Sequence, residues 1–208
     1  MSMQEMTVRS LVDLTASDAP APGGGSVSAL SGSFAAALSA MVGSLTLGKK
    51  GYEGVQEEMT EAMAKAKDLA QRLLVAMDED ASSFNGFMAA LGMPKGTEEE
   101  KAIRRAAMQE ALKSASLVPL NTARLAAEVF PLAEAMVKDG NKNAVTDGLV
   151  AAMMARTAVL GALLNVKINL GSIRDDAFVA ELKAHCQQLQ SLAVAEEQRI
   201  LALAADLA

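Results

Sequence analysis

Asp80 is a strong candidate for a residue that carries chemistry, because it lies on an apolar helix surface. Four apolar residues fall within about 40° of it on a predicted helix over residues 55–91: Leu73, Phe84, Phe87 and Leu91. Burying a carboxylate is costly unless a cation or hydrogen-bond donors face it. Such a group often has a raised pKa and can exchange protons near neutral pH. The pattern also fits a structural aspartate that is partnered near the end of a helix bundle.

Asp147 is a second candidate, because it lies among apolar residues in the first turn of a predicted helix over 144–170. It either exchanges protons or complements the helix dipole. Asn165 lies on the same helix face, roughly 27 Å further along an unbroken helix. Both reach one small ligand only if the helix breaks near Gly161 or a second subunit intervenes. Asn165 and Asn169, four residues apart, either bind a ligand or pair two helices through their amides.

A glycine-rich loop precedes the predicted helix over 27–47. It consists of Pro22, Gly23, Gly24, Gly25 and Ser26, and we expect Ser26 to be the N-cap. Backbone N–H groups in such a loop can hold an anion or a carboxylate. The loop is neither a Walker phosphate loop nor a dinucleotide fingerprint, because no Gly-Lys-Ser/Thr follows it and no strand precedes it. Alternatively, the glycines only allow the N-terminal helix to fold back.

The next loop contains Lys49, Lys50 and Tyr52, a basic pair beside the only tyrosine. If the loop is exposed, these are solvated side chains. If it lies near the glycine-rich loop, they attract an anionic tail and supply a proton-transfer group. We interpret His185 and Cys186 as incidental, which leaves little support for nucleophilic catalysis by a Ser/His/Asp or Cys/His arrangement.

Composition sets the fold class. The chain has 208 residues and a net charge of −6, with 51% hydrophobic and only 3% aromatic residues, and alanine is the most frequent residue. Alanine favours helices, whereas strands favour β-branched and aromatic residues, so we expect an all-α fold. The acidic balance argues against nucleic-acid binding. One cysteine and one histidine exclude an internal disulfide and the usual zinc or iron–sulfur sites, so no metal is expected.

Apolar periodicity and Gly/Pro breaks predict a single all-α domain over 1–208, a multi-helix bundle of about five long helices plus short ones. The expected helices cover 6–17, 27–47, 55–91, 97–130 with a kink at Pro119, 131–138, 144–170 and 175–207. Thr97 and Glu100 form a capping-box pattern at the start of the fourth helix.

One segment invites a membrane interpretation, because residues 19–48 carry no charge and 26–48 is long enough to be tested as a span. Small residues recur there every four positions: Ser28, Gly32, Ala36, Ala40, Ser44 and Gly48. They favour a helix buried in a bundle, against which a second helix can pack closely. The first 16 residues lack the uninterrupted apolar core of a signal peptide, so we expect a soluble cytoplasmic protein.

Six short stretches recur in the order that one known family shows. They are Pro-Ala-Pro-Gly-Gly-Gly-Ser (20–26), Leu-Gly-Lys-Lys-Gly-Tyr (47–52), Asp-Glu-Asp-Ala-Ser-Ser-Phe (78–84), Met-Pro-Lys (93–95), Gly-Asn-Lys-Asn-Ala-Val-Thr-Asp (140–147) and Asn-Val-Lys-Ile-Asn (165–169). The ordered set spans nearly the whole chain and resembles the cyclodeaminase/cyclohydrolase family. That family comprises the C-terminal domain of formiminotransferase-cyclodeaminase and the stand-alone methenyltetrahydrofolate cyclohydrolases.

The resemblance implies an all-α homodimer with a tetrahydrofolate derivative as substrate, no metal or redox cofactor, and no membrane. We expect hydrolysis of 5,10-methenyltetrahydrofolate to 10-formyltetrahydrofolate, because no formiminotransferase domain accompanies the chain. The first alternative is a formimidoyltetrahydrofolate cyclodeaminase that releases ammonia. The second is a non-enzymatic helical module that dimerises through its apolar helices.

Both reactions need an acid/base group beside the one-carbon unit and negative charge to stabilise the cation. We assign the first role to Asp147 or Asp80 and a second proton transfer to Lys50. The expected substrate-binding residues are Pro22, Gly23, Gly24, Gly25, Ser26, Lys49, Tyr52, Lys95, Asn141, Asn165 and Asn169. Among these, the glycine-rich loop would hold the pterin or the carboxylate tail, the basic residues and the tyrosine the tail, and the asparagines the pterin.

Overall fold

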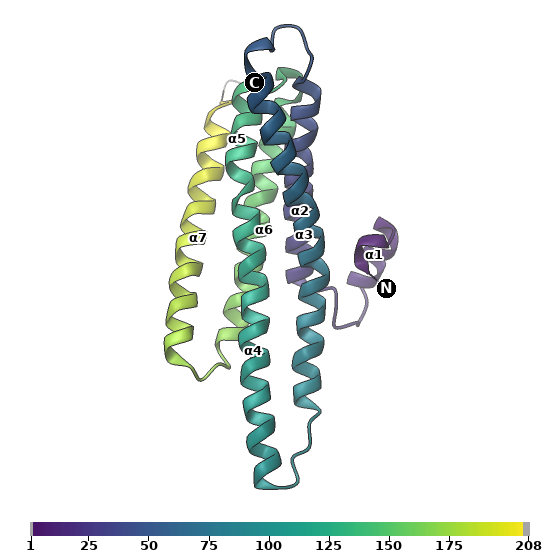
Figure 1. Cartoon of the computed structure of the whole chain (residues 1–208), viewed down its shortest axis with the longest axis vertical. Helices are drawn as coiled ribbons and strands as arrows, with labels where there is room; N and C mark the ends of the chain where they lie inside the picture. Colours follow the sequence, from purple (N-terminus) through teal and green to yellow (C-terminus); the bar gives the residue numbers. More distant parts are fainter. Residues whose placement is uncertain (1, 206–208) are drawn as a thin grey trace.

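The computed structural model describes residues 2–205, and all regular structure in that range is helical (Figure 1). The α-helices are α1 (Val8–Thr15), α2 (Gly24–Thr46), α3 (Gln56–Leu91), α4 (Glu98–Ala127), α5 (Val129–Asp139), α6 (Val145–Leu170) and α7 (Asp176–Ala202). Three short 3-10 helices lie at Met3–Glu5, Glu53–Val55 and Lys142–Ala144. The all-α fold is therefore confirmed, with α2, α3, α4, α6 and α7 as the long helices.

Helix α2 is packed closely between α3 and α6 because its contact faces carry small residues. A Cβ atom at Gly32 would lie 3.2 Å from Leu73 and 3.3 Å from Ala158. One turn earlier, the Ser28 side chain lies so close to Gly161 of α6 that a Cβ there would collide with it. The hydroxyl of Ser28 donates a hydrogen bond to the Gly24 carbonyl of its own helix, so it keeps a partner although it is buried between α2 and α6.

Two helical segments are long and apolar enough to cross a membrane, by length and composition alone. They are Gly24–Thr46 and Lys142–Leu170, with mean hydropathies of 1.4 and 1.8. In the first, 61% of the most apolar window is buried inside the bundle. Core helices of soluble bundles have the same composition, so this finding is weak evidence for a span.

Some helix boundaries differ from the sequence-based prediction. Helix α2 begins at Gly24 with Gly23 as N-cap, so the assignment of Ser26 as N-cap is wrong. Gly24 and Gly25 adopt helical geometry because tertiary contacts hold them, which a propensity argument does not anticipate. Pro119 lies inside α4, which ends at Ala127 instead of 130. The capping box of Thr97 and Glu100 is confirmed, and residues 206–207 of the predicted last helix lie outside the described range.

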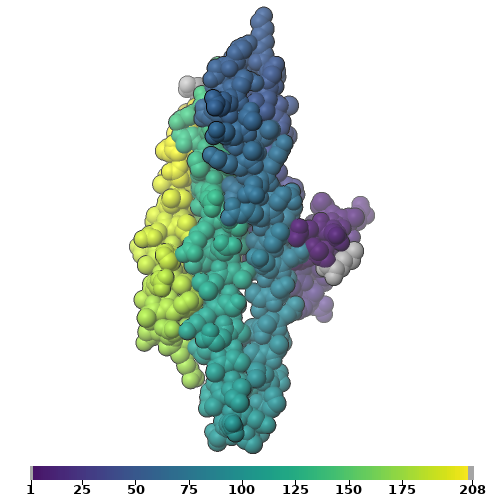
Figure 2. All heavy atoms as spheres, viewed as in Figure 1, coloured from purple at the N-terminus to yellow at the C-terminus, as the bar shows by residue number. Residues whose placement is uncertain are grey.

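The ends of the long helices are staggered. Helices α3 and α4 continue past the ends of α6 and α7 as a projecting hairpin, visible at the bottom of Figures 1 and 2. Helix α2 begins well above the tip of this hairpin, and its first turn lies beside Asn165 near the end of α6. The stagger leaves a hollow below the N-terminus of α2, flanked by α3, α4 and α6.

Candidate active site

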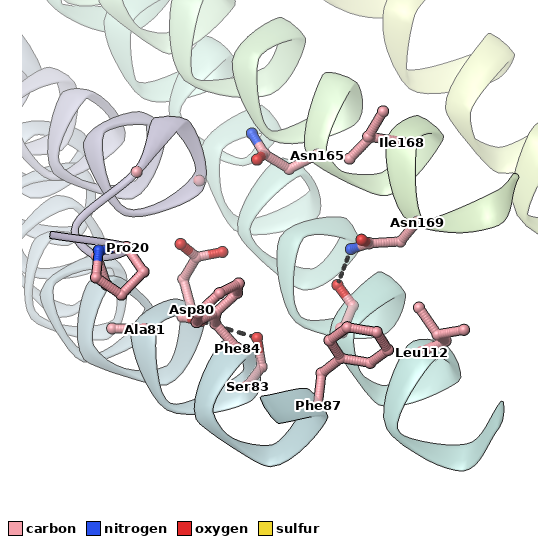
Figure 3. A pocket seen from close by; sticks show the side chains of 14 residues that line it. Pro20, Asp80, Ala81, Ser83, Phe84, Phe87, Leu112, Asn165, Ile168 and Asn169 are labelled. Atoms are coloured by element: carbon pink, nitrogen blue, oxygen red, sulfur yellow. Dashed lines mark hydrogen bonds between the residues drawn. The ribbon is translucent and has the colours of Figure 1, made fainter. Parts of the chain in front are cut away.

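A pocket of about 310 Å³ occupies this hollow (Figure 3). Four helices and the loop before α2 supply its walls. Its lining residues are Pro20, Ala21, Gly23, Gly25, Asp80, Ala81, Ser83, Phe84, Phe87, Leu112, Ala115, Asn165, Ile168 and Asn169. The pocket therefore combines one carboxylate, two amides and an apolar wall, as is typical of small-molecule sites.

Asp80 lies on α3 directly against the first turn of α2. The Ser26 hydroxyl donates a hydrogen bond of 2.8 Å to Oδ2 of Asp80. Burial raises the pKa of the Asp80 carboxyl above its usual value, and the hydrogen bonds from the side chain and backbone of Ser26 offset part of this rise. The carboxyl is thus partly buried, oriented by a neighbour and shifted toward the pH range where it can exchange protons.

Gly25 makes this close approach possible. A Cβ atom at Gly25 would lie 2.2 Å from Oδ1 of Asp80 and 2.6 Å from its Cγ. No side chain fits at that position while Asp80 keeps its place. The glycine-rich loop and the aspartate, 55 residues apart in the sequence, therefore form one structural unit.

Two asparagines of α6 face the pocket from the opposite side (Figure 3). The Asn165 amide donates to the Gly161 carbonyl at 3.0 Å, and the Asn169 amide donates to the Ala115 carbonyl at 2.8 Å. Each side chain is thereby fixed through its NH₂ group. The carbonyl oxygen of each amide is left as an acceptor for a ligand N–H.

Phe84 and Phe87 form an aromatic wall one and two turns beyond Asp80 on α3. In the sequence they contributed only to the apolar face that surrounds the aspartate, and their role in lining a pocket was missed. The spacing Asp80, Phe84, Phe87 would have indicated it, because an exposed end of an apolar stripe beside a carboxylate is where a ligand ring can stack. Ile168, Leu112 and Pro20 were missed as well.

The remaining predicted site residues lie elsewhere in the chain. Lys49, Lys50 and Tyr52 follow the other end of α2, where the Tyr52 hydroxyl accepts a hydrogen bond from the Lys142 backbone at 3.0 Å. Asp147 lies in the first turn of α6, at this same end of the bundle. Helix α6 runs unbroken from there past Gly161 to Leu170, at the pocket. The structure therefore does not bring these groups to the pocket of their own chain.

Asn141 and Lys95 also lie outside the pocket. Asn141 is buried, and its amide donates to the Leu45 carbonyl at 3.0 Å while its backbone N–H donates to Thr46 at 2.8 Å. It thereby closes the C-terminal end of α2. Lys95 is exposed in the loop at the tip of the α3–α4 hairpin. Both stay predictions as substrate-binding residues.

Neither the apolar hollow beside α1 nor the thiol of Cys186 resembles a catalytic centre. A hollow of about 500 Å³ between α1 and the outer surfaces of α2 and α3 is lined mainly by apolar residues and has no ionisable side chain. Burial raises the pKa of the Cys186 thiol, which makes it less reactive. Within residues 2–205, no three His, Cys, Asp or Glu side chains gather as a metal site would require.

Known proteins share both the sequence and the fold. The model of the formiminotransferase-cyclodeaminase family matches residues 7–188. The chain belongs to this family. It is 40% identical over 194 residues to a protein of Methylorubrum extorquens named methenyltetrahydrofolate cyclohydrolase, covering 93% of each chain. The family membership expected from the six short sequence stretches is thereby confirmed.

Other members of the formiminotransferase-cyclodeaminase family are longer or carry a different name. The chain is 36% identical over 191 residues to formimidoyltransferase-cyclodeaminase of Sus scrofa, but spans only 35% of that protein. A crystal structure named formiminotetrahydrofolate cyclodeaminase, from Thermotoga maritima, superposes with a TM-score of 0.87 at 28% identity and covers 98% of both chains. The family thus includes relatives named for each of the two activities considered above.

Proposed function

We propose that this chain hydrolyses 5,10-methenyltetrahydrofolate to 10-formyltetrahydrofolate. The observation that carries the proposal is Asp80, a partly buried carboxyl of raised pKa in a pocket with an aromatic wall. The Methylorubrum extorquens relative, which matches this chain over nearly its full length, is named for that activity.

The substrate is a cation whose charge is spread over N5, N10 and the carbon that joins them. The Asp80 carboxylate stabilises this charge and accepts a proton from the water that attacks the carbon. The C–O bond forms, and the resulting carbinolamine collapses as its C–N5 bond breaks. N5 leaves with a proton from a second proton-transfer group. The overall reaction consumes one water and releases one proton.

Side chains around the pocket match the shape and polarity of the substrate. Phe84 and Phe87 offer faces for stacking with a flat ring. The amide oxygens of Asn165 and Asn169 can accept hydrogen bonds from N–H groups of a pterin. A pocket of about 310 Å³ is at the small end for ligand sites, so the ring system would fill it and the acidic tail would extend outward.

The second candidate is a formimidoyltetrahydrofolate cyclodeaminase. The observation that favours it is the likeness to the Thermotoga maritima structure of that name. There N10 attacks the formimino carbon and ammonia leaves after protonation, so the same carboxyl would serve.

Two assays separate the candidates. The purified chain is mixed with 5,10-methenyltetrahydrofolate, and loss of the methenyl absorbance is followed against the uncatalysed rate. Ammonia release from 5-formimidoyltetrahydrofolate is measured in parallel. Catalysis of only the second reaction would replace the first proposal. If neither substrate turns over, and calorimetry with folates gives no heat, the non-enzymatic module becomes the better description.

We further propose that the enzyme is a cytoplasmic homodimer that works without a metal or redox cofactor. Water attack on an activated cation needs only acid–base groups, which supports the last part. Unchanged turnover after dialysis against a chelator would agree with it, and sedimentation of the native protein tests the dimer. Localisation of the tagged protein in its own cells tests the compartment.

A further inference from the structure

The groups chosen from the sequence as an active site lie at opposite ends of one helix pair. Asp80 contacts the first turn of α2. Lys50 lies at the other end, four residues after α2 ends at Thr46. Helix α2 has 23 residues, so about 33 Å separates its two ends. No bend of α2 or α6 shortens this distance, because both helices are continuous.

We infer that a second copy of this chain supplies Lys50 to the Asp80 pocket, so that each active site is built from two subunits. This inference rests on the proposed function. A two-fold axis across the middle of α2 would pair this helix with its copy in antiparallel orientation. The start of α2 in one chain would then face the end of α2 in the other.

An exposed apolar surface lies between the two ends. On α2 it consists of Val27, Phe34, Met41 and Leu45, each between 39% and 48% exposed, and the first two also line the hollow beside α1. On α6 it consists of Val150, Met153, Leu164 and Ile168, each between 42% and 75% exposed. Helical spacing places both stripes on the same side of the α2–α6 pair, next to the Ser31–Met154 contact that joins the helices.

This surface supplies most of the area that a stable dimer needs. Two adjacent helices of about 10 Å diameter and about 33 Å length present a face of about 650 Å². A typical specific interface buries about 800 Å² on each partner. The α3–α4 hairpin, which projects past α2 and exposes Phe84 and Met88, would add to the buried area by covering the end of the second copy.

The register of the apolar stripe carries Lys50 to the correct place. Opposing Val27 with Leu45 of the second copy centres the pairing on Ala36. The same pairing brings Pro22, beside the pocket, level with Lys50 of the partner subunit. The pocket opens beside Ile168, on the side where the two stripes lie.

Charge complementarity supports the same arrangement. Neither Lys49 nor Lys50 forms an ion pair within residues 2–205, and Asp80 has no cationic partner there. Antiparallel pairing sets the two lysines opposite the carboxylate. The partner's Lys49 then attracts the acidic tail of the substrate.

The partner's Lys50 also completes the proton balance. Asp80 takes a proton from water, and Lys50 of the partner subunit gives one to N5 as the C–N5 bond breaks. The hydroxyl proton of the carbinolamine returns to that lysine as the formyl C=O forms. The proton on Asp80 passes to solvent, which gives the net release of one proton.

Mixed dimers test the inference. Chains carrying Asp80→Asn and Lys50→Met, with different affinity tags, are co-expressed and purified through both tags. Each homodimer should lose at least about 100-fold in turnover. The mixed dimer has one pocket with both wild-type residues and should recover about half of the wild-type turnover. Full turnover of the Lys50→Met homodimer, or a mixed dimer as inactive as its parents, would overturn the inference.

A reciprocal mixed dimer is the matched control. Here a wild-type chain is paired with a chain carrying both Asp80→Asn and Lys50→Met. If each site uses two subunits, every pocket contains one lesion and turnover is lost. If each site lies within one chain, one pocket is intact and about half of the turnover remains.

A cross-link decides the geometry independently of activity. Ala21→Cys lies at the pocket and Glu53→Cys lies near Lys50, while the native Cys186 is buried. A short-arm bismaleimide should join chains carrying the two single substitutions into a product of twice the chain mass. Failure to join them overturns the shared site. Joining without any folate turnover leaves the shared pocket supported and rejects the proposed function instead.

Discussion

Gly25 and Asp80 are in direct contact, and the contact leaves no space for a side chain on the glycine. A Cβ atom there would lie 2.2 Å from the carboxylate oxygen Oδ1. The first turn of α2 and the middle of α3 therefore fix the position of the acid/base group together. Three predictions concern this contact, and a fourth concerns the ion pair between Glu134 of α5 and Arg199 of α7.

Gly25→Ala should displace the Asp80 carboxyl and lower turnover by about 100-fold or more, because a proton-transfer group must lie within hydrogen-bond distance of its target. The matched control is Gly54→Ala, since no atom lies within 4 Å of a Cβ at Gly54. Steady-state kinetics of both variants, with circular dichroism to verify folding, make the comparison. Equal turnover of the two variants would show that the position of Asp80 is not critical.

Asp80→Asn should keep the fold and lose about two to four orders of magnitude in kcat, because an amide cannot accept the proton from water. Glu79→Gln is the control, since Glu79 is the exposed neighbouring carboxylate. The measurement is the loss of methenyl absorbance at saturating substrate. If Asp80→Asn retains turnover while Asp147→Asn abolishes it, the assignment of the acid/base group must move to Asp147.

The pH dependence of kcat/KM should have an acid limb at a higher pH than an ordinary aspartate would give, because burial raises the pKa of Asp80 and only its ionised form accepts a proton. Ser26→Ala removes the hydrogen bond to the charged form, which raises the pKa of Asp80 further. The limb should therefore move to higher pH in this variant. An unchanged limb would mean that another group titrates.

Glu134→Gln should destabilise the fold by about 1 kcal/mol at pH 7, because Glu134 of α5 pairs with Arg199 of α7 and with Lys138. These partners, Arg199 foremost, lower the pKa of Glu134 to about 2 from 4.5. The stabilisation is present above pH 4.5 and is lost as the pH falls toward 2.

Urea unfolding at several pH values measures the effect of Glu134→Gln. The difference from wild type should shrink below pH 4.5. Glu181→Gln, an exposed carboxylate on α7, should show almost no difference at any pH. A gap that widens as the pH falls would contradict the sign of the shift.

The fold could be predicted from the sequence because its signals are local. Alanine content, Gly/Pro breaks and the capping box at Thr97 each predict helices or their ends without reference to distant residues. The start of α2 was predicted three residues late for the same reason. Helix propensity penalises glycine, and the helical geometry of Gly24 and Gly25 depends on their tertiary contacts with Asn165 and Asp80.

The site was predicted only in part, because residues with the same local sequence pattern lie at different ends of the folded bundle. Asp80 and Asp147 both sit among apolar residues on helices, yet only Asp80 lines the pocket with Asn165 and Asn169. Sequence spacing along α6 indicated the separation of Asp147 from Asn165 but not which of them would meet Asp80. Phe84 and Phe87 were missed because a phenylalanine that covers a core and one that lines a cavity have the same periodicity.

Tyr52 is the only tyrosine, and the chain has no tryptophan. It lies in the loop that carries Lys49 and Lys50, and its hydroxyl accepts a hydrogen bond from the Lys142 backbone N–H. The intrinsic fluorescence of the native protein therefore comes chiefly from Tyr52, whose position is known. An absorbing folate that settles near that loop would quench it, which gives an unlabelled optical readout of how far the ligand reaches.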